Sequence, residues 1–262
     1  MEKIVSINKL DFGYNNQNIL KNINLEIHNN ERILLFGSNG AGKSTLLKII
    51  GGLNIVKSYS DFSVLGKSIP NDQCGGLAYL GDRWERSTPF CGMSPYTGDI
   101  RVGDMMKKWQ EEHIERRDEL VKVLDIDLDW RMHTVSDGQR KKVQIMLGLL
   151  YPFRLLVIDE FLNSLDIIVR DQFYQYIEKE CQNRGASVIY ATHIFDNLEK
   201  YMNKVLYIKD GSCSSILEMD IFLKGGSLFQ AVKNVLINDT NSDNHIAESH
   251  NTGYSSGRFK NY

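Results

Sequence analysis

The chain has 262 residues, of which 42% are hydrophobic and 24% charged, an ordinary composition for a globular protein. Its formal net charge is −2 with a pI near 6.3, so no basic excess indicates a nucleic-acid-binding surface. Residues 1–12 lack the apolar segment of a signal peptide, and no stretch approaches the roughly 20 apolar residues that a membrane span needs. We therefore expect a soluble protein of the cytoplasm or nucleus. The four cysteines form no C-x-x-C pair, which favours reduced thiols over a zinc site: Cys74, Cys91, Cys181 and Cys213.

Two strands joined by a turn are the first predicted elements. Residues 21–27 alternate polar and apolar side chains, as a half-buried strand does, and residues 4–10 match that pattern more weakly. The segment 13–18 between them is rich in Asn and Gly, which indicates a turn.

A phosphate-binding loop follows the next strand. Gly37–Ser44 fits G-x-x-x-x-G-K-[ST] at every fixed position. The apolar run 32–36 before it has strand length, and residues 45–50 after it predict a helix start. In this context the glycines let successive N–H groups converge on phosphate oxygens, and the helix N-terminus adds its positive dipole. The alternative is a glycine-rich turn that binds no ligand.

Each residue of this loop is therefore a candidate contact to nucleotide. Lys43 would neutralise the β- and γ-phosphates, and Ser44 would hold Mg²⁺. The predicted nucleotide-binding residues of the loop are Gly37, Ser38, Asn39, Gly40, Ala41, Gly42, Lys43, Ser44 and Thr45.

The middle of the chain predicts helices inserted between two strands. Residues 77–80 form a short apolar strand, and residues 87–98 are irregular because they contain prolines and glycines. Residues 102–124 are then rich in charged residues and helix formers. A helical insert within an α/β core is the simplest interpretation.

The second half alternates apolar strands with helical segments, which favours a parallel sheet. Strands are predicted at 155–158, 187–192 and 204–208, with a helix at 169–181. In such sheets ligands bind at the carboxyl ends of the strands. Asp159, Glu160 and His193 all fall at strand ends, as the phosphate loop does, so we expect one shared site.

These three residues have expected roles beside a nucleotide. Asp159 would reach Mg²⁺ through water, and Glu160 could accept a proton from the attacking water. The alternative is that both carboxylates only cap the following helix. His193, which alone would be read as a packing or solvent-facing side chain, is a candidate contact to the γ-phosphate.

The C-terminal segment 226–262 differs from the preceding domain, which we place at residues 1–225. From about Asn234 it is polar and rich in Asn, Ser and Gly. Such a segment buries too little apolar surface to offset its ordering entropy, so we predict disorder.

Taken in order, the motifs GSNGAGKST, VSDGQR, LLVIDE, NSLD and ATH resemble those of an ATP-binding cassette (ABC) ATPase over roughly residues 3–215. The resemblance implies an α/β fold: a P-loop parallel-sheet core, an N-terminal antiparallel β subdomain, and a helical insert at about 87–150. It also implies ATP and Mg²⁺ as ligands and a dimer that sandwiches two ATP molecules head to tail; we expect a homodimer, and a heterodimer is the alternative.

The resemblance assigns further roles to matching residues. The signature, whose backbone N–H groups would bind the γ-phosphate held by the opposite subunit, is Ser136, Asp137, Gly138 and Gln139. Asp166 would belong to the loop that links the two sites. Tyr14 would stack on adenine, unless it is an ordinary strand-end tyrosine.

Three departures from the family pattern stand out. Asp137 replaces a glycine and adds a carboxylate near the polyphosphate, which weakens binding unless the side chain turns away. Phe161-Leu162 replaces the usual Pro-Thr type of pair. Asp82 stands where a glutamine is expected; it is a candidate metal ligand, but its presence weakens the case for coupling to a membrane transporter.

Two stretches, 135–153 and 185–199, resemble the small soluble ABC ATPases of the plant I subfamily and a fungal factor associated with the carbon-catabolite-repressor–NOT complex. This resemblance implies an ATPase with a regulatory, non-transport protein partner. Two alternatives remain: a nucleotide-binding subunit of a membrane transporter, or an ATP-dependent scaffold with little hydrolysis.

Overall fold

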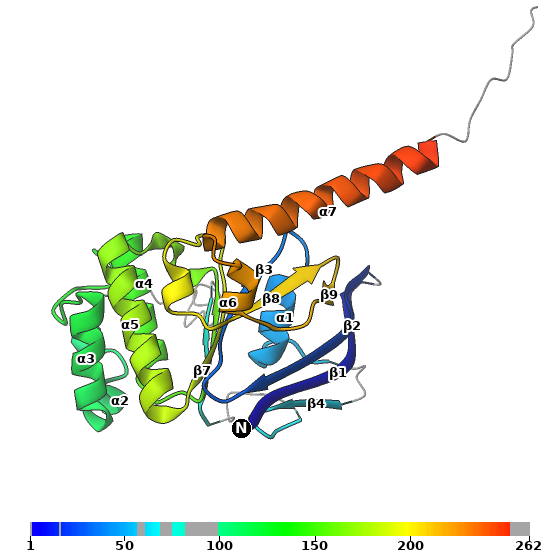
Figure 1. Ribbon diagram of the computed structural model, residues 1–262. Helices are drawn as coiled ribbons and strands as arrows, with labels where there is room; N and C mark the ends of the chain where they lie inside the picture. Colours follow the sequence, from blue (N-terminus) through cyan, green and yellow to red (C-terminus); the bar gives the residue numbers. More distant parts are fainter. Residues whose placement is uncertain (1, 16, 57–60, 69–74, 82–98, 252–262) are drawn as a thin grey trace, which may run out of the picture.

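The computed structural model describes residues 2–15, 17–56, 61–68, 75–81 and 99–251. Its smaller sheet is antiparallel, with the strand order β2-β1-β4. The strands of this sheet are β1 (Lys3–Tyr14), β2 (Gln17–His28) and β4 (Asp61–Val64). They form the N-terminal β subdomain that the motif resemblance implied (Figure 1).

The larger sheet has the order β10-β8-β3-β7-β6-β5, and β9 pairs with β8. Its strands are β3 (Arg32–Phe36), β5 (Leu77–Leu80), β6 (Leu155–Asp159), β7 (Ser187–Ala191), β8 (Lys204–Lys209), β9 (Ser212–Cys213) and β10 (Leu217–Glu218). The strands β5, β6, β7, β3 and β8 run parallel, while β9 and β10 are antiparallel to β8. The predicted parallel core is confirmed.

The helices pack on this larger sheet or on one another. They are α1 (Lys43–Ile50), α2 (Lys107–Glu112), α3 (Ile114–Leu124), α4 (Asp137–Gly148), α5 (Ile167–Arg184), α6 (Met219–Leu223) and α7 (Leu228–Asn251). Short 3-10 turns are η2 (Val102–Asp104), η3 (Phe161–Ser164) and η4 (Leu198–Lys200). The helices α2, α3 and α4 lie between β5 and β6 in the chain, as a helical insert requires. Residues 87–98 of the predicted insert lie outside the described residues.

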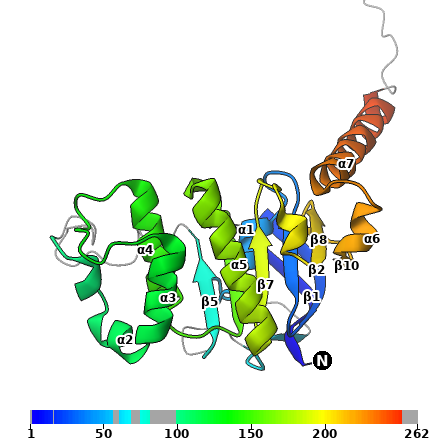
Figure 2. The same cartoon turned by 60° about the vertical axis from the view of Figure 1, so that its left-hand side comes forward.

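Two hydrophobic cores lie on opposite faces of the parallel sheet, because successive residues of a strand point to opposite faces. In β6, Leu156 and Ile158 join the core with α3, α4 and α5, whereas Leu155 and Val157 join the core with α1 and the small sheet. Figure 2 shows the sheet between these two groups of elements. Burial on both faces explains why the sequence of each central strand is continuously apolar.

The C-terminal segment does not follow the prediction of disorder. Helix α7 occupies residues 228–251, and its first turns pack on the core: Leu228 and Val232 are each 1% exposed. Val235 and Leu236 continue the same face and are partly buried. The spacing i, i+4, i+7, i+8 makes one apolar stripe in an otherwise polar segment, and burial of that stripe stabilises the helix. Residues 252–262 lie outside the described residues.

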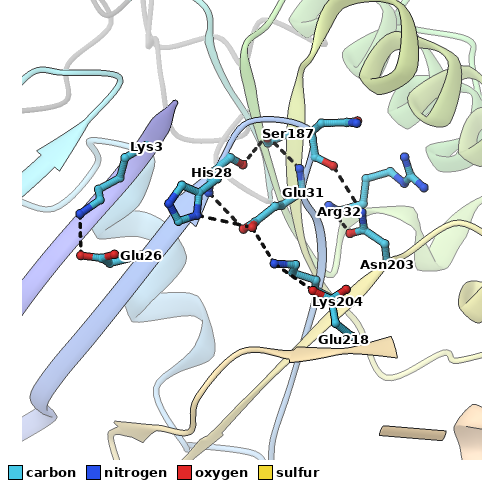
Figure 3. Close-up of polar contacts among 10 residues, drawn as sticks. Lys3, Glu26, His28, Glu31, Arg32, Ser187, Asn203, Lys204 and Glu218 are labelled. Atoms are coloured by element: carbon cyan, nitrogen blue, oxygen red, sulfur yellow. Dashed lines mark hydrogen bonds and ion pairs between the residues drawn. The ribbon is translucent and has the colours of Figure 1, made fainter. Parts of the chain in front are cut away.

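A polar cluster joins the two sheets at the amino ends of the parallel strands (Figure 3). Glu31 is 4% exposed, and its carboxylate accepts hydrogen bonds from Lys204 Nζ at 2.7 Å and from the backbone N–H of His28 at 3.1 Å. Ser187 Oγ accepts from the Glu31 N–H and donates to the His28 carbonyl. The cluster lies at the opposite end of the strands from Asp159, Glu160 and His193.

Candidate nucleotide site

The phosphate loop connects β3 to the N-terminus of α1 and depends on glycine at two points. Gly42 caps α1 with a φ of 107°, in the left-handed region that other residues rarely adopt. A Cβ at Gly37 would lie 2.2 Å from the carbonyl oxygen of Ile208, so only glycine lets the loop pack against β8. The backbone N–H groups at the start of α1 therefore have the form of an anion-binding site.

Lys43 lies within this loop. Its Nζ donates hydrogen bonds to the carbonyl oxygens of Gly37 and Ser38, both at 3.0 Å, and the residue is 5% exposed. Burial lowers the pKa of Lys43, while the nearby carboxylates of Glu160 and Asp159 oppose that shift. The lysine is thus a partly desolvated donor fixed at the place where phosphate oxygens would bind.

Ser44 and Asp159 are hydrogen-bonded at the carboxyl ends of the central strands. Ser44 Oγ donates to Asp159 Oδ1 at 2.9 Å, and Tyr79 Oη donates to Asp159 Oδ2 at 3.1 Å. Burial raises the pKa of Asp159, and these hydrogen bonds oppose the shift. A hydroxyl beside a carboxylate is a donor set that suits Mg²⁺ shared with substrate phosphates. Asp82, the third predicted ligand, lies outside the described residues.

Glu160 and His193 form a pair at the ends of neighbouring strands. His193 Nε2 lies 2.9 Å from Glu160 Oε1, and the Glu160 N–H donates to the Ala191 carbonyl at 2.9 Å. Glu160 has a φ of 54°, in the left-handed region that non-glycine residues adopt infrequently. Both side chains remain partly exposed, so a ligand at the carboxyl ends of the strands could reach the pair.

The predicted signature residues form the N-terminus of α4. Ser136 caps the helix through two reciprocal hydrogen bonds. The Gln139 backbone N–H donates to Ser136 Oγ at 3.2 Å, and the Ser136 backbone N–H donates to Gln139 Oε1 at 2.9 Å. The Asp137 carboxylate is 93% exposed and accepts from Arg140 Nη1 at 3.0 Å. Arg140 therefore offsets the charge that Asp137 adds at this position.

The segment around Asp166 adjoins the signature helix. Asp166 caps α5 by accepting from the Val169 N–H at 3.0 Å, and this bond lowers the pKa of its carboxyl. Lys142 of α4 lies 3.7 Å from the same carboxylate. A Cβ built on Gly138 would lie 3.7 Å from the Ser164 carbonyl oxygen. The signature and Asp166 thus belong to one continuous surface.

That surface is separate from the phosphate loop. In Figure 2, α4 lies on the opposite side of β5 from α1, and Figure 1 likewise separates the two helices. The residues predicted to act on the phosphates and the metal gather at the carboxyl ends of the central strands: Lys43, Ser44, Asp159, Glu160 and His193. Within the described residues, one chain therefore does not bring α4 to its own phosphate loop.

Tyr14 lies at the end of β1 and is 46% exposed. Its ring meets Phe12 edge-on, with centroids 5.0 Å apart, and its hydroxyl accepts from Asn54 Nδ2 at 2.7 Å. The backbone N–H of Asn54 donates to the carbonyl oxygen of Lys48, in the carboxyl half of α1. These contacts tie Tyr14 to the end of α1 away from the phosphate loop, and its role at adenine stays a prediction.

A family model described as ABC transporter matches residues 20–163, more than half of the chain. The chain belongs to the ABC transporter family. It is 43% identical over 207 residues to ABC transporter I family member 20 of Arabidopsis thaliana, covering 77% of this chain but only 63% of that relative. It is 37% identical over 243 residues to CCR4-associated factor 16 of Saccharomyces cerevisiae, covering 87% and 82%. The family and relatives that the motifs indicated are confirmed.

Solved structures of ABC proteins share the fold. An ATP-binding subunit of an ABC transporter superposes with a TM-score of 0.73 at 21% identity, covering 88% of this chain and 98% of that chain. A dimeric bacterial ABC transporter cassette gives a TM-score of 0.65 at 19% identity, covering 82% and 98%. Together with the family match, this fold places the chain among P-loop ATPases of the ABC type. In the described part of this ABC protein, no helix is both long and apolar enough to cross a bilayer.

Tyr79 is the site residue that sequence reasoning missed in this ABC protein. The sequence shows it only as one residue of a short apolar strand, and its contact with Asp159 joins positions 80 residues apart. The available signal was its place near the carboxyl end of a strand beside β6.

Proposed function

We propose that this ABC protein hydrolyses Mg²⁺-ATP in a head-to-tail homodimer and thereby regulates a non-transport protein partner. One observation carries the dimer: the capped N-terminus of α4 and the phosphate loop lie in different parts of one chain. A second copy, related by a two-fold axis, would bring its α4 to the nucleotide held by the first.

In this arrangement each ATP is held from two sides. Lys43 and the loop N–H groups bind the phosphates from one chain, and the N–H groups around Ser136 and Gly138 bind the γ-phosphate from the other. Bound Mg²⁺, held by Ser44 and Asp159, would neutralise charge on the phosphates. The water oxygen attacks the γ-phosphorus, Glu160 accepts the water's proton, and the bond to ADP breaks. His193 orients Glu160 and the γ-phosphate.

Exposed apolar residues support a second copy beside Asp166. Ile167 and Ile168 are 70% and 68% exposed, and they line a groove together with Arg170 and Asp196. This groove adjoins the Asp166 segment, which in the proposed dimer faces the other chain. An exposed apolar pair of this kind is typical of an interaction surface.

The decisive variant is Glu160→Gln, which keeps the side-chain shape but cannot accept the proton. We expect hydrolysis to fall by about 10²–10⁴-fold and an ATP-bound dimer to accumulate, measured by light scattering after size exclusion. Glu160→Gln combined with Lys43→Ala should stay monomeric, because it lacks the phosphate contact. A Glu160→Gln protein that hydrolyses normally and stays monomeric at saturating ATP contradicts the proposal.

The relative named CCR4-associated factor 16 supports a partner of the carbon-catabolite-repressor–NOT type. Affinity purification of Glu160→Gln with ATP, followed by identification of bound proteins, tests this part. We expect subunits of such a complex in the ATP sample and their loss with Lys43→Ala. Stoichiometric recovery of a multi-span membrane protein would instead favour the transporter alternative.

A further inference from the structure

The Asp159 carboxylate has a separate hydroxyl donor on each oxygen. Ser44 of α1 donates to Oδ1 at 2.9 Å, and Tyr79 of β5 donates to Oδ2 at 3.1 Å. The strands β5 and β6 are parallel neighbours with Tyr79 opposite Val157, so Tyr79 and Asp159 project from the same face of the sheet. This is the face that α1 covers.

The Tyr79 ring lies between two glycines. A Cβ at Gly51, which ends α1, would lie 2.6 Å from Tyr79 Cδ2, and a Cβ at Gly81 would lie 2.6 Å from Cε1. Both distances are shorter than real Cβ contacts, so side chains at these positions would displace the ring. The ring thus occupies space that a side chain at either glycine would take, and its hydroxyl reaches Asp159.

From this geometry we propose that Tyr79 is a positioning residue of the ATPase, whose hydroxyl holds the Asp159 carboxylate in the orientation that serves Mg²⁺-ATP. The inference rests on the proposed function, since it assigns Asp159 to the metal. A hydrogen bond to the outer oxygen of a ligand carboxylate fixes its rotamer, and such supporting partners tune metal affinity.

A tyrosine suits this role because its side chain is neutral and its ring packs against Gly51 and Gly81, outside the phosphate loop. A lysine or arginine here would compete with the metal for the carboxylate charge. The Ser44 hydroxyl is itself a candidate ligand: its oxygen can coordinate a cation while its O–H donates to Asp159, so its position would depend on the metal. The Tyr79 hydroxyl comes from a different element and donates to the other oxygen of the carboxylate.

The test removes only the hydroxyl, in Tyr79→Phe of the full chain. Binding of a fluorescent, non-hydrolysable ATP analogue is measured as a function of free Mg²⁺ and again in EDTA. We expect Tyr79→Phe to need about tenfold more Mg²⁺ for half-maximal binding, with unchanged affinity in EDTA and an unchanged Tm. Tyr201→Phe is the matched control, because Tyr201 also donates to a carboxylate, that of Asp171, at 2.8 Å; we expect it to bind as wild type does.

A second variant tests the confinement of the ring. Gly51→Ala places a methyl group against Tyr79, so we expect it to raise the Mg²⁺ requirement by a similar factor. In the Tyr79→Phe background it should add little, because the two changes disturb the same hydrogen bond.

The outcomes separate this inference from the function on which it rests. If wild type shows no Mg²⁺-dependent nucleotide binding, the proposed site itself is wrong. If wild type depends on Mg²⁺ and Tyr79→Phe has the same Mg²⁺ requirement, the positioning role alone is overturned. It is also overturned if Tyr79→Phe loses affinity equally with and without Mg²⁺, or lowers the Tm, since those results indicate a purely structural role.

Discussion

At the scale of single residues, the environment of each aspartate determines what it can do. Asp137 is almost fully exposed and pairs with Arg140. Asp159 is partly buried and accepts hydrogen bonds from two hydroxyls, which suits the metal-ligand role proposed for it. Asp166 caps a helix. The three positions are chemically alike in the sequence, and only their contacts assign them different functions.

Asp166 gives a prediction with a defined pH dependence. The Val169 N–H lowers the pKa of the Asp166 carboxyl, so its stabilisation is present above the ordinary aspartate pKa and is lost as pH falls through the lowered value. Asp166→Ala should therefore cost about 1 kcal/mol at pH 7, as loss of an N-cap does. This cost should shrink below about pH 4, as measured by urea unfolding.

The control for this prediction is Asp137→Ala, which removes an exposed carboxylate paired with Arg140. It should change the free energy of unfolding by less than about 1 kcal/mol at either pH. An equal cost of Asp166→Ala at pH 7 and at pH 3 would show that the ionised carboxylate is not what stabilises the cap.

At the scale of elements, local pattern and tertiary contact contribute in different proportions. The strands of the parallel sheet are predictable from the sequence because short, continuous apolar runs are typical of strands that are buried on both faces. The start of α4 is likewise local, since Ser136 and Gln139 cap it within one turn. Helix α7 differs, because it is stabilised by the burial of Leu228 and Val232 against the core, which the local sequence does not show.

The junction between the sheets provides a prediction at this scale. Glu31→Gln removes the carboxylate that Lys204 and the His28 N–H bond in the buried cluster (Figure 3). We expect a loss of about 1.5–3 kcal/mol in the free energy of unfolding, the range for hydrogen bonds to a buried charge. Chemical denaturation measures it.

Lys3→Ala is the matched control, because it breaks an exposed ion pair close to the Glu31 cluster (Figure 3). It breaks the Lys3–Glu26 ion pair, which is close at 2.6 Å but exposed, with side-chain exposures of 44% and 57%. Such surface pairs contribute about 0–1 kcal/mol. Similar losses for the two variants would mean that the Glu31 cluster does not hold the sheets together.

At the scale of the whole molecule, the proposed dimer depends on the surface beside Asp166. The double variant Ile167→Asp, Ile168→Asp places charge on this exposed apolar pair at the N-terminus of α5, where acidic residues are favourable for the helix. We expect the Tm to stay unchanged and the ATP-bound dimer of Glu160→Gln to be lost, as measured by light scattering.

Ile221→Asp on α6 is the control for this surface, because Ile221 is similarly exposed at 63% but belongs to another element. It should leave the dimer intact. Dimerisation that survives the double variant would place the interface elsewhere and remove the support that the Ile167–Ile168 pair provides.

The amino-acid sequence by itself determined the phosphate loop, the alternation of strands and helices, and the strand-end residues Asp159, Glu160 and His193. Each depends on a local pattern of a few residues, which needs no distant partner to be recognised. The tertiary structure alone decided which side chains meet: Tyr79 with Asp159, Glu160 with His193, and the apolar stripe of α7 with the core. These contacts join residues far apart in the chain, and their geometry exists only once packing has selected one arrangement of the elements.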